Sequence, residues 1–212
     1  MMGLIDFLFR WGHVLAGITW IGLLYYFNFV QGEYFKEAEA GAKADATKKL
    51  APRALWWFRW GAMLTFLTGV YLLYVLGAGT NQYIFLGALM GIFMFLNVWL
   101  IIWPAQKIVI GITPGDAATA GPKALLASRT NTLFSAPMLF GMLGSKHGPF
   151  GAGFEPAMKS FGDVGFLAAL GLIVVIQINA VVGKVGPMAS VSGVIHSSLA
   201  LTAVIFGIVY FI

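Results

Sequence analysis

The 212-residue sequence contains no cysteine and few charged residues. The lack of cysteine excludes disulfide bonds, thiolate metal sites and a covalently attached c-type haem from these residues. Charged residues make up only 10% of the chain, whereas a typical soluble domain has about a quarter. The sequence also lacks a glycine-rich phosphate loop, a serine–histidine motif and a nucleic-acid-binding surface. These absences argue against nucleotide chemistry, hydrolysis by a serine nucleophile and nucleic-acid binding.

Long apolar segments take the place of the missing charge, since 59% of the residues are hydrophobic. A membrane-spanning helix needs about 20 apolar residues, and six candidate segments occur at residues 4–30, 55–78, 83–103, 128–143, 164–182 and 191–212. We therefore predict an all-α, polytopic integral membrane helix bundle, one domain over residues 1–212, with about six transmembrane helices. The fourth segment contains Arg129, Asn131 and Pro137, which favour a kinked or partly buried helix. If it does not cross, five spans remain.

The distribution of lysine and arginine predicts the orientation of these spans. Nine of these residues fall in loops on one side and three on the other, with Arg59 inside the second span. Because basic loops stay in the cytoplasm, we predict a multi-pass protein of the bacterial inner membrane with its N-terminus outside. The first 30 residues lack a signal-peptide pattern, which favours a retained first span. The mixed-charge segment 32–54 is expected to extend the first span as a solvated helix, and Pro104 to end the third.

Two histidines lie deep in predicted spans. His13 and His196 are each about nine residues from a span end, so each lies about 13 Å below its surface, near the middle of a core about 30 Å thick. Gly17 and Gly193 have no side chains, so a flat ligand or a second helix can approach the helix closely near each histidine. Neutral imidazoles on neighbouring helices can ligate haem iron from opposite faces. We predict a haem b between His13 and His196; the alternative is that each histidine only hydrogen-bonds to a neighbouring helix.

Four further residues are candidate contacts of a cofactor. Arg10 and Arg59 lie within spans, where a guanidinium can pair with a haem propionate or snorkel to the interface. His147 lies near the outer surface, either solvated or in contact with a propionate, a substrate or a partner. Asn131 can contact a cofactor or form a hydrogen bond between helices. No carboxylate lies deep in a span, so a carboxylate proton relay has no support.

Four stretches of the chain follow a family pattern in order: R-W-x-H-x-x-x-G-I-x-W-I-G at residues 10–22, L-W-W-F-R-W at 55–60, G-x-x-x-G with M, N-V and P-x-Q-K at 87–107, and P-x-L-F-x-M followed by histidine at 137–147. Together they resemble the N-terminal membrane domain of bacterial urate hydroxylase, the cytochrome c-coupled urate oxidase. The resemblance covers roughly residues 4–150 and implies a membrane scaffold with His13 and His147 at matching positions. Proteins of that family end in a c-type cytochrome domain, so this cysteine-free sequence resembles a short form without it.

Three functions are compatible with these features. The first is an integral membrane redox protein with a b-type haem, working with a c-type cytochrome or within a larger membrane redox complex. The second is a urate-oxidising membrane domain, an oxidoreductase component whose cytochrome is a separate polypeptide. The third is a cofactor-free accessory subunit of a respiratory or photosynthetic complex. All three place the protein in a lipid bilayer without a nucleic-acid partner.

Overall fold

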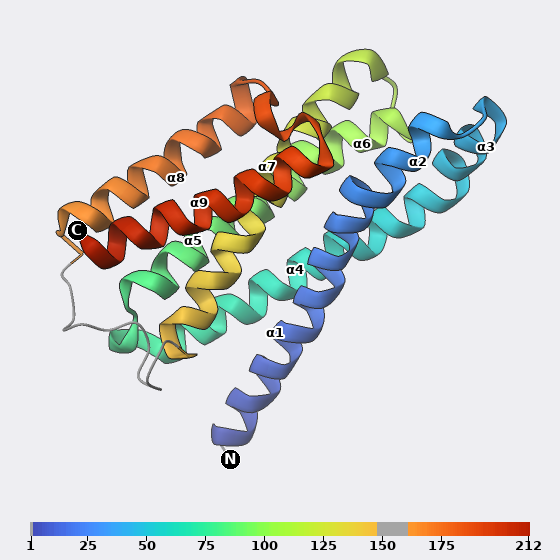
Figure 1. The fold of residues 1–212 in the computed structure, drawn as a ribbon. Helices are drawn as coiled ribbons and strands as arrows, with labels where there is room; N and C mark the ends of the chain where they lie inside the picture. The colour runs from blue at the N-terminus through green and yellow to red at the C-terminus, as the bar shows by residue number, and fades with distance from the viewer. Residues whose placement is uncertain (1, 148–160) are drawn as a thin grey trace. The chain divides into compact units, whose positions relative to one another are not determined.

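The structure is a computed structural model that describes residues 2–147 and 161–212 (Figure 1). The described residues form helices and connecting turns and contain no β-strand, which confirms the all-α class. The α-helices are α1 (Met2–Tyr25), α2 (Gly32–Glu37), α3 (Ala40–Asp45), α4 (Ala51–Leu76), α5 (Gln82–Leu96), α6 (Trp103–Val109), α7 (Ala117–His147), α8 (Val164–Val182) and α9 (Val191–Phe211). Shorter π-helical turns are η1 (Tyr26–Gln31), η2 (Ala46–Leu50) and η4 (Asn97–Ile102), and 3₁₀ turns are η3 (Gly77–Gly79) and η5 (Gly186–Ala189).

Five helical stretches among the described residues are long and apolar enough to cross a membrane. They are Gly3–Glu37, Ala40–Gly79, Gln82–Val109, Val164–Val182 and Val191–Phe211. Each overlaps one of the predicted spans, so five of the six are confirmed as helices of the required length and composition. A helix that is apolar on all sides is buried in protein or in lipid, and large side chains such as Leu100 and Val182 are exposed. The chain is a multi-pass membrane protein.

The predicted fourth span is the C-terminal part of α7, a 31-residue helix. It is about 46 Å long, longer than a bilayer core of about 30 Å, but it is not among the five apolar stretches. The polar residues that lower its hydropathy are themselves buried, among them Arg129, Asn131 and Ser135. The predicted burial of this segment is therefore confirmed, and its crossing of the membrane stays a prediction.

Two predicted helix boundaries were wrong. The segment 32–54 does not simply extend the first span: the helix ends at Glu37, residues 38 and 39 have extended backbone with ψ of 140° and 150°, and a second helix begins at Ala40. Two extended residues are enough to reverse the chain, so the charges are divided between two helices. Pro104 does not end the third span either: it lies in the first turn of α6, which follows η4 directly, so the helical stretch continues through it. That helix continues to Val109.

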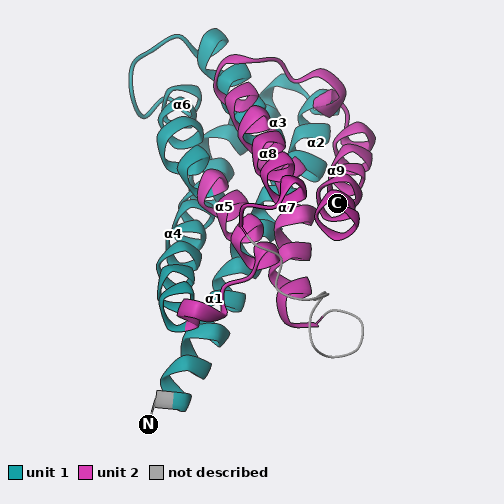
Figure 2. Cartoon of the chain, turned by 90° about the vertical axis from the view of Figure 1, so that its left-hand side faces the viewer, with its two compact units in different colours: residues 1–75, 95–129 teal, residues 76–94, 130–212 magenta. Residues whose placement is uncertain are grey.

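The residue contacts divide the chain into two compact units (Figure 2), which we describe separately. Unit 1 comprises residues 1–75 and 95–129, and unit 2 comprises residues 76–94 and 130–212. This division does not test the prediction that residues 1–212 form one domain, so that statement stays a prediction.

In unit 1, α1 and α4 lie side by side (Figure 1) because small residues allow a close approach. A Cβ atom added at Gly61 on α4 would lie 3.2 Å from the backbone nitrogen of Trp20 on α1. Farther along the pair, the rings of Phe27 and Phe58 meet edge to face, with centroids 5.6 Å apart. These contacts fix the register in which α1 presents its polar side chains to α4.

In unit 2, glycines join α5 to α7 and α8 to α9. A Cβ added at Gly87 would lie 2.9 Å from the carbonyl oxygen of Met138, and one added at Gly141 would lie 2.6 Å from that of Tyr83. A Cβ added at Gly165 on α8 would lie 2.8 Å from the carbonyl oxygen of Ile208 on α9. Since backbones meet directly at these points, only glycine fits there without a shift of the helices.

Candidate functional site

The candidate site begins on the face of α1 that contacts α4. Asp6, Phe9 and His13 follow one another along this face at helical spacing. The hydroxyl of Tyr71 donates a 2.8 Å hydrogen bond to Asp6 Oδ1, and the Tyr71 ring stacks on Phe9 with centroids 3.8 Å apart. One turn deeper, His13 contacts the backbone of α4 at Thr65. The histidine is thus held by the helix pair rather than by α1 alone.

The hydrogen bonds of His13 define which ring nitrogen carries the proton. Its Nδ1 lies 3.0 Å from the carbonyl oxygen of Thr65 and 3.1 Å from the Thr68 hydroxyl oxygen. A carbonyl can only accept, so Nδ1 is the protonated donor. The Thr68 hydroxyl donates to the carbonyl of Leu64 at 2.6 Å, which leaves its oxygen to accept from His13. In the neutral imidazole, Nε2 therefore keeps its lone pair, the arrangement found in metal-ligating histidines.

One glycine contacts this imidazole, and a second lies one turn away on α1. A Cβ added at Gly69 on α4 would lie 3.1 Å from Cε1 of His13, so the ring rests directly on that glycine. At Gly17 on α1, one turn from the histidine, an added Cβ would meet nothing within 4 Å. The open space expected one turn from His13 is therefore present at Gly17. That a cofactor occupies this space stays a prediction.

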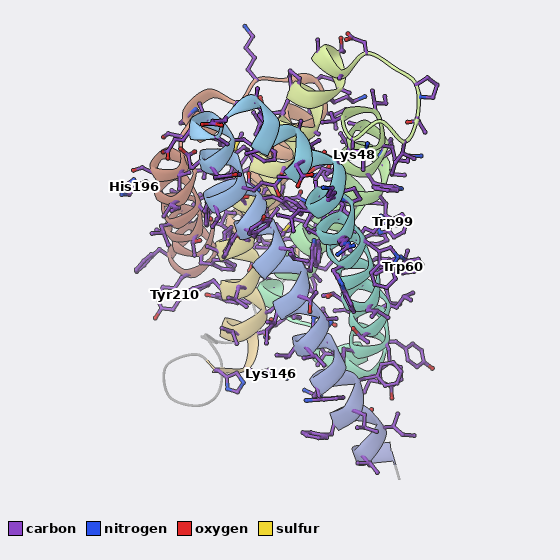
Figure 3. The ribbon with its side chains drawn as sticks, turned by 90° about the vertical axis from the view of Figure 1, so that its right-hand side faces the viewer. Lys48, Trp60, Trp99, Lys146, His196 and Tyr210 are labelled. Atoms are coloured by element: carbon purple, nitrogen blue, oxygen red, sulfur yellow. The ribbon has the colours of Figure 1, made fainter. Side chains whose placement is uncertain are left out.

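His196 belongs to unit 2 and is exposed on the outer side of α9 (Figure 3). Its Nδ1 lies 3.1 Å from the hydroxyl oxygen of Ser192, one turn earlier on the same helix. Gly193, the small residue predicted to lie beside His196, is in the first turn of α9 and packs against the preceding turn, η5. A Cβ added there would collide with the carbonyl oxygen of Pro187. His13 and His196 lie in separate units, so their pairing across a haem stays a prediction.

The two candidate arginines differ in environment. Arg10 is exposed on α1. Arg59 on α4 lies over the ring of Trp103, with its guanidinium carbon 3.9 Å from the ring centroid. Nearby in unit 1, Trp60 and Trp99 meet with centroids 5.7 Å apart (Figure 3). A cation on an indole beside other tryptophans is typical of the membrane–water interface, and both alternatives for Arg59 stay predictions.

Asn131 and His147 lie on α7. The Asn131 side chain is buried, and its Nδ2 donates a 2.9 Å hydrogen bond to the carbonyl oxygen of Met94 on α5. It therefore joins two helices, as one of the two alternatives predicted. His147 is the last residue of α7 and is exposed. In the described part of the chain, no group of three or more histidine, aspartate or glutamate side chains could hold a metal ion.

A polar-edged cavity in unit 1 was not predicted. Asn28 and Gln31, both on η1, line it. The sequence contained a signal for it, since these are the only amide side chains in the first apolar segment and its continuation, residues 4–37. The π-helical turn changes the direction of the side chains that follow, which sequence periodicity cannot reveal, and such turns are frequent at functional sites.

Comparison with known families adds one observation. Residues 76–160 match the family model described as urate oxidase N-terminal. The match covers fewer than half of the residues and runs from the end of α4 past α7, so it includes Asn131 and His147 but not His13 or His196. It confirms the resemblance to the urate oxidase family over this part of the chain. The curated proteins and the solved structures gave no match.

Proposed function

We propose that this chain is the membrane component of a redox system in which a b-type haem, ligated by His13 and His196, exchanges electrons with a separate c-type cytochrome. The protein lies in the bacterial inner membrane with its N-terminus outside and the basic loops 31–53 and 105–123 in the cytoplasm. In this proposal Arg10, which is exposed on the N-terminal half of α1, meets a propionate or the docked cytochrome. Haem iron supplies the one-electron exchange in this scheme.

The geometry of His13 carries the proposal. Its Nδ1–H is directed at the Thr65 carbonyl, which leaves Nε2 unprotonated and holds the ring in one orientation. The side chain is partly buried, whereas the open space at Gly17 leaves room beside α1 for a flat group. A histidine that served only to join α1 to α4 would satisfy the same bond, and the test below separates the two roles.

The test is the visible spectrum of purified protein expressed with a haem supply. Reduced b-type bands are expected in the wild type, and they should be lost or weakened in His13→Ala and in His196→Ala. His147→Ala, at an exposed helix end, is the matched control and should keep the bands. Added imidazole should restore the spectrum of His13→Ala if the protein is folded and only the ligand is missing. Protein without haem, or unchanged bands in both variants, would refute the proposal and favour the accessory subunit.

The second candidate function is oxidation of urate by this membrane domain together with a cytochrome on a separate polypeptide. It is favoured because residues 76–160 match the urate oxidase N-terminal family. These 212 residues contain no cysteine for a covalently attached haem, so they cannot themselves carry a c-type haem, and the assay must supply a cytochrome. The test is urate consumption by membranes containing the protein, with and without added oxidised cytochrome c. Consumption that requires both components supports this candidate, and no consumption in either condition excludes it.

A further inference from the structure

The cavity of unit 1 has a volume of about 250 Å³ and lies among three of the membrane-crossing helical stretches and the start of α7. Pockets for drug-sized ligands typically enclose about 300–1,000 Å³, so this cavity suits a single ring. Its apolar wall includes the rings of Phe27, Phe35 and Phe58. No lysine, arginine, aspartate, glutamate or histidine lines it, so its occupant is an uncharged group.

The polar edge of the cavity consists of Asn28, Gln31, Thr47, Gln106 and Ser128, and it includes hydrogen-bond acceptors. Both amide hydrogens of Asn28 are used, since Nδ2 donates to the carbonyl oxygen of Leu24 at 2.9 Å and to the hydroxyl oxygen of Ser128 at 2.8 Å. The remaining polar atom of Asn28 is Oδ1, an acceptor. The side-chain oxygen of Gln31, three residues later on η1, is buried and has no hydrogen-bond partner. A buried acceptor without a donor is costly, so the Gln31 oxygen calls for a ligand that donates, and the Asn28 oxygen is a second acceptor at the same edge.

We propose that this cavity binds the ring of a quinol from the bilayer. A quinol is uncharged and flat, and its hydroxyl groups can donate to the amide oxygens of Gln31 and Asn28 while the phenylalanines enclose the ring. The position of the cavity among membrane-crossing helices admits an apolar molecule from the lipid. This proposal rests on the proposed redox function in one respect: it takes the quinol to be the electron donor of that redox protein.

The chemistry of the acceptors predicts a preference for the reduced form. A quinone carries carbonyl oxygens in place of hydroxyls, so it has no proton to donate to Gln31 Oε1. One neutral hydrogen bond corresponds to about a 2- to 10-fold change in affinity. Decylubiquinol should therefore bind at least about 2-fold more tightly than decylubiquinone.

The experiment is calorimetric titration of the purified protein in detergent, under anaerobic conditions, with decylubiquinol and with decylubiquinone. Gln31→Leu should weaken decylubiquinol binding by about 2- to 10-fold and remove the preference for the reduced form. Gln177→Leu on α8, outside the cavity, is the matched control and should bind like the wild type.

A second variant fills the cavity instead of changing its polarity. Gly121 lines the cavity, and a Cβ added there would meet nothing within 4 Å, so Gly121→Leu should fold and occupy the ligand's space. At Gly171 on α8 an added Cβ also meets nothing within 4 Å, which makes Gly171→Leu the control. Loss of quinol binding in Gly121→Leu alone supports the proposal.

Two outcomes overturn the quinol site: no binding of decylubiquinol to wild-type protein, or wild-type affinity in both Gln31→Leu and Gly121→Leu. Either result leaves a cavity filled only by water. Because the titration does not depend on haem, protein that lacks haem but binds the quinol would refute the proposed haem function and leave this site standing.

Discussion

The α5–α7 contact offers a sharp test of the structure because two glycines one turn apart meet different atoms. A Cβ added at Gly87 would lie 2.9 Å from the carbonyl oxygen of Met138 and 3.1 Å from the backbone nitrogen of Met142. A Cβ added at Gly91 would lie 3.5 Å from the sulfur of Met138 and from Cε of Met142, which are ordinary contacts with flexible side chains. Gly87→Ala and Gly91→Ala therefore differ only in whether the new methyl group meets backbone.

The magnitude follows from two opposing terms. Replacing glycine by alanine inside a helix stabilises it by about 1 kcal/mol through propensity, and this gain is common to both variants. Overpacking against atoms that cannot move costs about 1–3 kcal/mol, and it applies only at Gly87. Gly91→Ala should be neutral or up to about 1 kcal/mol more stable than the wild type. Gly87→Ala should be about 1–3 kcal/mol less stable than Gly91→Ala.

The assay is unfolding in mixed micelles of a mild detergent and increasing dodecyl sulfate, followed by circular dichroism, with the free energy of unfolding compared at one micelle composition. Gly141→Ala, where an added Cβ would lie 2.6 Å from the carbonyl oxygen of Tyr83, should be destabilised in the same direction as Gly87→Ala. If Gly87→Ala proves as stable as Gly91→Ala, the close contact of α5 with α7 is not the one described here.

Three further predictions test other parts of the chain. Single cysteines at Ala42 and Ala118 should react with an impermeant reagent only after the membrane is opened, and labelling in intact cells would contradict the orientation. Hydrogen bonds from the Thr119 hydroxyl and the Ala118 N–H lower the pKa of Asp116. Its stabilisation should be complete above the ordinary value of about 3.9 and be lost as pH falls through the lowered one, and Asp116→Asn should abolish that loss in acid unfolding curves. Asn28→Ala should lower the free energy of unfolding by about 1–3 kcal/mol, measured in the same micelles.

The sequence by itself determined the helices and their apolar character. The predicted fifth span, residues 164–182, coincides with α8, and the sixth differs from α9 by one residue at its end. The reason is local: a run of about 20 apolar residues can satisfy its backbone groups in lipid only as a helix. Boundaries that depend on turns were less predictable. Nothing in the composition of residues 32–54 indicated that the reversal would fall at residues 38 and 39.

Tertiary structure alone decided the chemistry of individual side chains. The sequence located His13 in the first span, but the proton on its Nδ1 is defined by the carbonyl of Thr65, 52 residues away. It located Asn131 in a polar stretch, but only the packing of α7 on α5 directs its amide to Met94. The unpartnered oxygen of Gln31 follows from a π-helical turn and from walls contributed by distant helices. Hydrophobicity is a property of a segment and can be read along the chain, whereas hydrogen-bond partners and cavities require atoms from several segments at defined distances.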